Sequence, residues 1–75
     1  MGKAEARERL SAEIERIVTH AVRMRSIVRT GYFAGMLAVA YAETGLSTSD
    51  IIDAIADAAA RRGVAVEITR PQDDT

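Results

Sequence analysis

Cysteine is absent from the 75-residue chain, and histidine occurs once, at position 20. The lack of thiols excludes disulfides and cysteine-based zinc sites, and one imidazole cannot supply a cluster of nitrogen ligands. No stretch reaches 18 apolar residues, and the N-terminus lacks the apolar segment of a signal peptide. We therefore expect a soluble cytoplasmic protein with no metal, no cofactor and no membrane contact.

The composition is nevertheless that of a folded domain, with 48% hydrophobic and 28% charged residues. The length allows one helical domain, which we place at residues 1–70 and follow with a flexible tail at 71–75. A core of this size rarely supplies more than about 3–5 kcal/mol, so helix packing or a partner must hold the chain together. No catalytic constellation is present, and we expect a protein that is not an enzyme.

Charge is distributed unevenly along the chain. Residues 1–30 hold seven basic and four acidic side chains, a net charge of +3, whereas residues 31–60 hold four acidic side chains and no basic one. Such a separation suits contact with another protein better than contact with nucleic acid phosphates.

Apolar spacing predicts a first helix over Ala4–Thr30 that Gly31 ends in a left-handed conformation. Its expected apolar seam repeats at intervals of three and four residues, at Leu10, Ile14, Ile17, Ala21, Met24 and Val28. Glu5 with Arg9 and Glu13 with Arg16 have the spacing of ion pairs on a helix surface.

The segment from Tyr32 to Glu43 is apolar on every side, so we expect a central helix that Gly45 stops. A third helix begins after the N-cap Ser47, with Asp50 completing a capping box. Its buried stripe is predicted at Ile51, Ile52, Ile55, Ala58 and Ala59, and Gly63 is expected to end it.

Residues 64–68 alternate as a short strand does, because Val64, Val66 and Ile68 are separated by less apolar residues. One strand cannot pair alone. The segment is therefore expected to fray, to pack against the helices as extended chain, or to pair with a strand of another molecule. The predicted fold is an all-α three-helix bundle with a short extended C-terminal segment.

The central helix offers more apolar side chains than two neighbouring helices cover, and arginines lie near it along the chain. Aromatic residues and methionine beside arginine are typical of a binding interface. We therefore predict a partner-binding surface, or a homodimer interface, formed by Arg16, Arg23, Arg25, Arg29, Tyr32, Phe33, Met36 and Tyr41. An alternative pairs the arginines of the first helix with Asp53 and Asp57 across the bundle.

A helix, the turn Thr44-Gly45-Leu46-Ser47 and a capped second helix resemble the helix-turn-helix of bacterial repressors. A DNA reader usually exposes cationic or amide side chains early in the second helix, but this chain places Asp50, Asp53 and Asp57 there. A small dimeric helix-turn-helix DNA-binding regulator therefore stays as the alternative, with DNA as an unlikely partner. A toxin–antitoxin or phage-borne inhibitor is a third option.

Over residues 5–63, the pattern Glu13-Ile14-Glu15-Arg16-Ile17-Val18 and the capped third helix resemble small antiactivators of proteobacterial conjugative elements. The resemblance implies a non-enzymatic regulator that binds a transcriptional activator, such as a quorum-sensing regulator, and holds conjugative transfer off. The implied mechanism is stoichiometric: the small protein covers the DNA-binding or activating surface of its partner.

Overall fold

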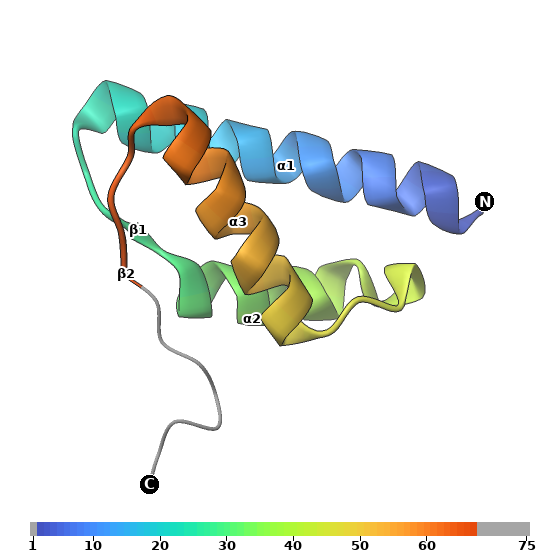
Figure 1. Cartoon of the computed structure of the whole chain (residues 1–75). Helices are drawn as coiled ribbons and strands as arrows, with labels where there is room; N and C mark the ends of the chain where they lie inside the picture. Colours follow the sequence, from blue (N-terminus) through green and yellow to red (C-terminus); the bar gives the residue numbers. More distant parts are fainter. Residues whose placement is uncertain (1, 68–75) are drawn as a thin grey trace, which may run out of the picture.

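The structure is a computed structural model that describes residues 2–67, and it is mostly helical, as expected (Figure 1). The expected tail at 71–75 and the end of the expected C-terminal strand lie outside the described residues. In chain order the elements are helix α1 (Lys3–Met24), strand β1 (Val28–Arg29), helix α2 (Thr30–Ala40), 3-10 helix η1 (Ala42–Thr44), helix α3 (Thr48–Arg62) and strand β2 (Val66–Glu67).

Helix α3 is the centre of the fold. It crosses in front of α1 and α2 in Figure 1 and packs against both, whereas α1 and α2 touch each other little. The fully buried residues Ile51, Ile52 and Ile55 lie on α3, and Val18 of α1 and Ala34 of α2 face them in the same core. The helices therefore form a three-helix fold in which α3 holds the other two.

The start and end of α3 follow from local signals in the sequence. The Ser47 side chain accepts a hydrogen bond from the Asp50 amide at 3.1 Å, and the Asp50 carboxylate accepts one from the Ser47 amide at 3.0 Å. This is the predicted capping box. Gly63 ends the helix with φ 72°, a left-handed conformation that glycine adopts without steric cost. The predicted buried stripe is also confirmed, since all five of its members are buried.

The predicted end of the first helix is wrong. Helix α1 stops at Met24, Arg25 takes the left-handed conformation with φ 53°, and Gly31 lies in the first turn of α2. The expected seam changes accordingly: Met24 is exposed, and Val28 is buried from a strand rather than from the helix. The physical reason is a long-range contact, because the residues after Arg25 extend to pair with a distant segment.

That distant segment is β2. The strands β1 and β2 pair in parallel, with Val28 opposite Val66 and Arg29 opposite Glu67. The expected alternatives for the C-terminal segment were therefore incomplete, since its strand partner lies within the chain, in a stretch that we assigned to the first helix. Buried Thr30 secures the pair, because its hydroxyl donates a 2.7 Å hydrogen bond to the Glu67 carbonyl.

The central helix begins and ends earlier than predicted, at Thr30 and Ala40, and the 3-10 turn η1 follows it. The buried Thr44 hydroxyl donates to the Tyr41 carbonyl at 2.8 Å and accepts from the Leu46 amide at 3.2 Å. Gly45 then reverses the chain with φ 75°, as its predicted role as a stop requires. Together α2, η1 and α3 form the predicted helical corner.

Candidate protein-binding surface

One face of α2 is apolar and exposed. Tyr32, Met36 and Val39 are spaced by four and three residues, so they share a face, and they are 67%, 47% and 81% exposed. Ala34 and Leu37 bury the opposite face against the core. This exposed face, which we term the apolar stripe, is the surplus of apolar surface that the sequence predicts.

A groove of about 360 Å³ adjoins α1 and α2. Its apolar lining comes from Ile17 and Ala21 of α1, Phe33 of α2, and Ile27 and Val28 between the two helices. Its polar lining comes from Glu13, Arg16, His20 and Ser26. Because α1 and α2 touch each other little, their side chains leave this space open. We term it the α1–α2 groove.

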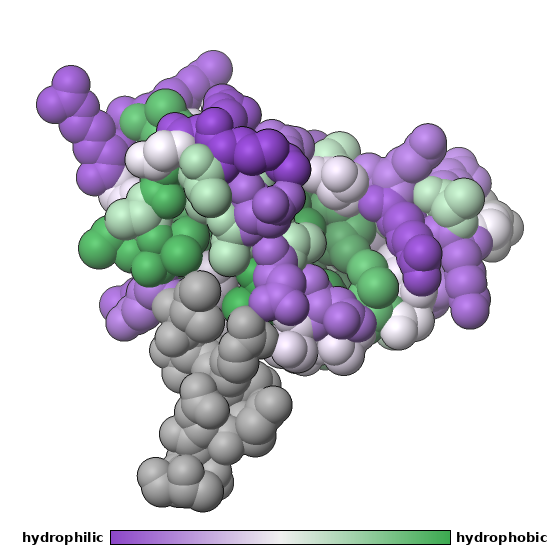
Figure 2. Space-filling view, in the orientation of Figure 1, coloured by the Kyte–Doolittle hydropathy of each residue, from purple (hydrophilic) through white to green (hydrophobic). Residues whose placement is uncertain are grey.

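The apolar stripe and the α1–α2 groove are neighbours. The ring of Tyr32 on the stripe meets the ring of Phe33 in the groove edge to face, with centroids 5.2 Å apart. Ile27, which is 63% exposed, continues the apolar surface from the groove toward Val66 of β2. In Figure 2 apolar residues gather at this end of the molecule, where Figure 1 places β1 and β2. The strand end, the groove and the stripe thus carry adjoining apolar patches.

The four predicted arginines lie around these patches, and all are exposed. Arg16 lines the groove, and Arg23 lines a shallow depression beside it that also includes Arg16 and His20. Arg25 lies in another depression with Ser26 and Ile27, and Arg29 projects from β1. Phe33 and Tyr41 differ from the other predicted residues, because both are half-buried against the core, Phe33 on α2 and Tyr41 just after α2 ends.

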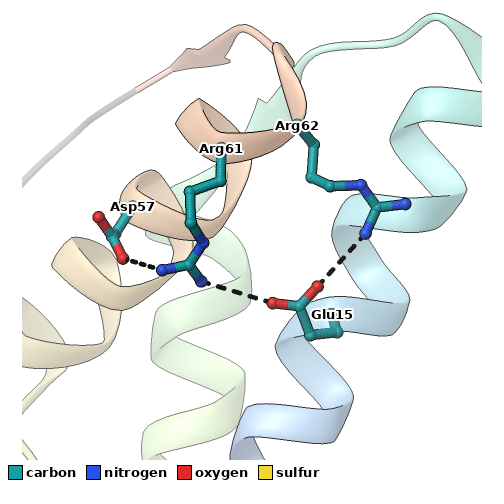
Figure 3. A network of polar contacts seen from close by, with 4 residues as sticks. All are labelled: Glu15, Asp57, Arg61 and Arg62. Carbon is teal, nitrogen blue, oxygen red and sulfur yellow. Dashed lines mark hydrogen bonds and ion pairs between the residues drawn. The ribbon is translucent and has the colours of Figure 1, made fainter.

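Ion pairs tie α1 to the end of α3, as Figure 3 shows. The Glu15 carboxylate lies 3.6 Å from Arg61 and 3.4 Å from Arg62, and Arg61 also contacts Asp57 at 2.6 Å. Asp57 and Arg61 are mostly exposed and Glu15 and Arg62 are about half exposed, so water screens each pair and each contributes little to stability. The predicted pairing of Asp57 with arginines of the first helix is therefore replaced by a pair within α3.

The local pairs predicted on α1 are confirmed. Arg9 lies 3.6 Å from Glu5, and Arg16 lies 2.9 Å from Glu13. Because both partners in each pair are close in sequence, spacing alone was sufficient to find them.

The outer face of α3 is acidic at its start. Asp50, Asp53 and Asp57 are exposed there, and hydrophilic residues cover α3 in Figure 2. Hydrogen bonds from the Ser47 amide and hydroxyl lower the pKa of Asp50 below its usual range, so this carboxylate is charged at neutral pH.

No protein-family model, curated protein or solved structure matches the chain.

Within residues 2–67, no group of three His, Asp or Glu side chains is placed to hold a metal ion. No helix in that range is both long enough and apolar enough to span a membrane.

Sequence reasoning found the stripe and the arginines but missed the groove. Ala21 is buried as predicted, but Ile17, which was assigned to the same buried seam, is only half-buried, and Ile27, which was placed in the first helix, follows it. The signal for the groove was the width of the apolar surface on that helix, which exceeds what one neighbour covers. Its position depends on the break at Arg25, which apolar periodicity does not report.

Proposed function

We propose that the chain is a non-enzymatic regulator that acts in the cytoplasm by binding a transcriptional activator and blocking it. This is the mechanism of the antiactivators of conjugative elements that the sequence resembles. The observation that carries the proposal is the apolar stripe, where Tyr32 and Met36 stay exposed beside arginines and an open groove. Exposed aromatic and methionine side chains next to arginine form the centre of many protein interfaces.

The acidic face of α3 supports a protein partner over DNA. In a helix-turn-helix protein this second helix would enter the major groove. Here Asp50, Asp53 and Asp57 would face the phosphates, and the first cation of the helix, Arg61, is paired with two carboxylates. Since neutralisation of phosphates supplies most nucleic acid affinity, such a helix is poorly suited to bind a duplex.

The proposal is tested by finding the partner and reconstituting its inhibition. Tagged protein is used to retain its partner from the native host, and the retained activator is identified and purified with its operator duplex. Adding the chain is expected to remove the activator from the duplex at about equimolar ratio, while the chain alone leaves the duplex unbound. Binding of the chain itself to the duplex, with affinity that falls steeply as salt rises, would refute the proposal.

Two variants locate the surface in this assay. Tyr32→Ala and Arg23→Glu are expected to weaken capture of the activator without unfolding the domain, since both side chains are exposed. Arg9→Glu is the matched control, because Arg9 is also exposed on α1 but lies four turns from Arg23 and has its own partner in Glu5. Equal capture by wild type and both test variants would show that the surface is elsewhere.

A further inference from the structure

The surface around the α1–α2 groove carries more basic than acidic side chains, although the groove lining itself holds one of each, Arg16 and Glu13. No Asp or Glu occurs from residue 16 to residue 42, a stretch that holds Arg16, Arg23, Arg25 and Arg29. This stretch forms the second half of α1, the connection, β1 and all of α2. Three carboxylates lie close by, and all are in ion pairs: Glu13 with Arg16 at 2.9 Å, Glu15 with Arg61 and Arg62 at 3.6 and 3.4 Å, and Glu67 with Arg29 at 3.9 Å. Arg23 and Arg25 add their charges on depressions that share residues with the groove.

The shape of the groove suits a helix. Its lining comes from two helices, with Ile17 and Ala21 on α1 and Phe33 on α2, and Ile27 and Val28 lie between them. A volume of about 360 Å³ admits apolar side chains from one face of an added helix. Arginines beside such a groove meet the flanks of that helix, where complementary residues are carboxylates.

We propose that the α1–α2 groove binds an amphipathic helix of a protein partner, with apolar anchors in the groove and Asp or Glu along its flanks. This inference rests on the proposed function, because it names the kind of segment that the partner presents. Charge complementarity with Arg23 and Arg25 selects an acidic helix over a basic one, whereas Arg16 is already paired with Glu13. The desolvated apolar anchors supply most of the affinity, and the arginines supply the preference for an acidic helix. These two contributions can therefore be measured separately.

A second copy of the chain does not offer this helix. Helix α3 carries carboxylates, but its isoleucines are buried in its own core. Helix α2 carries the exposed apolar stripe, but it contains no Asp or Glu. Helix α1 buries its own apolar seam, from Ala6 to Ala21. Within the described residues, a folded copy therefore lacks a helix that combines free apolar anchors with acidic flanks.

The test uses two synthetic peptides of about 18 residues, or five helical turns. One has leucines at i, i+3, i+4 and i+7 with glutamates on the flanks, and the other replaces every glutamate by lysine. Each is titrated into the ¹⁵N-labelled chain while amide shifts are recorded. The glutamate peptide is expected to bind about ten-fold more tightly than the lysine peptide, and to shift the amides of Ala21, Val28 and Phe33.

Two matched variants separate the groove from the apolar stripe. Ile27→Asp is expected to weaken binding of the glutamate peptide by about ten-fold or more, because it removes an apolar contact and adds a negative charge that repels the glutamates. Val39→Asp introduces the same side chain at an exposed position of the stripe outside the groove, and it is expected to leave binding within about two-fold. Circular dichroism spectra and thermal melts confirm that both variants are folded.

The possible outcomes separate this inference from the proposed function. Equal affinity for the two peptides, absence of binding, or loss of binding in Val39→Asp alone would each overturn the acidic-helix proposal. A concentration-dependent dimer that Ile27→Asp dissociates would also overturn it, since the groove would then hold a second copy. Removal of an activator from its operator tests the proposed function independently. If that activity persists while the glutamate peptide fails, only the groove inference falls.

Discussion

The ends of α1 and α3 have the same hydrogen-bond pattern but different residues at the left-handed position. At α1 the amide of Ser26 donates to the Ala21 carbonyl at 3.0 Å, and Arg25 has φ 53°. At α3 the amide of Val64 donates to the Ala59 carbonyl at 2.9 Å, and the left-handed residue is a glycine. A side chain in this conformation costs about 1–2 kcal/mol, and glycine avoids that cost but loses more chain entropy on folding, about 0.5–1 kcal/mol.

Arg25→Gly is therefore expected to raise the free energy of unfolding by about 0.5–1 kcal/mol, which is the difference between these two effects. For a domain of this size, that gain corresponds to an increase of about 2–8 °C in the thermal midpoint. The assay is thermal and urea unfolding followed by circular dichroism at several protein concentrations. Gly63→Ala at the equivalent position of α3 is the reciprocal control, and it is expected to lower the free energy of unfolding by about 0.5–1 kcal/mol, the same difference with the opposite sign.

A third variant separates conformation from charge. Arg25→Ala keeps a side chain in the left-handed conformation but removes the guanidinium, so its stability is expected to stay within about 0.5 kcal/mol of wild type. Both Arg25→Gly and Arg25→Ala are expected to weaken binding of the glutamate peptide, because each removes a cation beside the groove. A loss of stability in Arg25→Gly, or a gain in Gly63→Ala, would refute the conformational argument.

Three further predictions concern stability. Gly35→Ala is expected to raise the free energy of unfolding, measured in urea, by about 0.5–1 kcal/mol, because a Cβ at position 35 meets no atom within 4 Å. A decrease in this free energy would contradict the prediction. Thr30→Val is expected to lower the free energy of unfolding by about 0.5–1.5 kcal/mol and to speed hydrogen exchange of the Val28 amide. Unchanged exchange of this amide would argue against a role of the Thr30 hydroxyl in holding β2. Ser47→Ala is expected to cost about 1 kcal/mol and to raise the pKa of Asp50 in an NMR titration. Because the pKa of Asp50 is lowered in the folded protein, the ionised carboxylate stabilises the fold at neutral pH, and this stabilisation is lost as the pH falls through the lowered pKa. An unchanged Asp50 pKa in Ser47→Ala would contradict the capping argument.

The parts of the fold that sequence predicted well are those fixed by neighbours in the chain. The capping box of Ser47 and Asp50 joins residues three apart, and the buried isoleucines of α3 follow from the helical period. The left-handed glycine at position 63 needs only its own backbone conformation. All residues that form such a signal lie within one or two helical turns of each other, so these features can be predicted without the tertiary structure.

The parts that sequence missed depend on residues far apart in the chain. Val28 leaves the helical pattern because its amide donates to the Ala65 carbonyl at 3.1 Å, a contact between segments separated by two helices. Gly31 misled the prediction of the helix end, since a non-glycine residue occupies the left-handed position six residues earlier. Composition identified which residue types form the candidate surface, whereas the groove required the relative placement of α1 and α2.

The exposed surface follows from how the core is built. Helix α3 packs against both other helices and uses its three isoleucines to do so, which leaves α1 and α2 with few contacts to each other. A larger side chain from α2 into the groove would close this space, but the stripe residues Tyr32 and Met36 point their apolar surface outward instead. A small domain that leaves these side chains in solvent forgoes burial that would stabilise it. A partner that covers the stripe and the groove would recover that burial on binding.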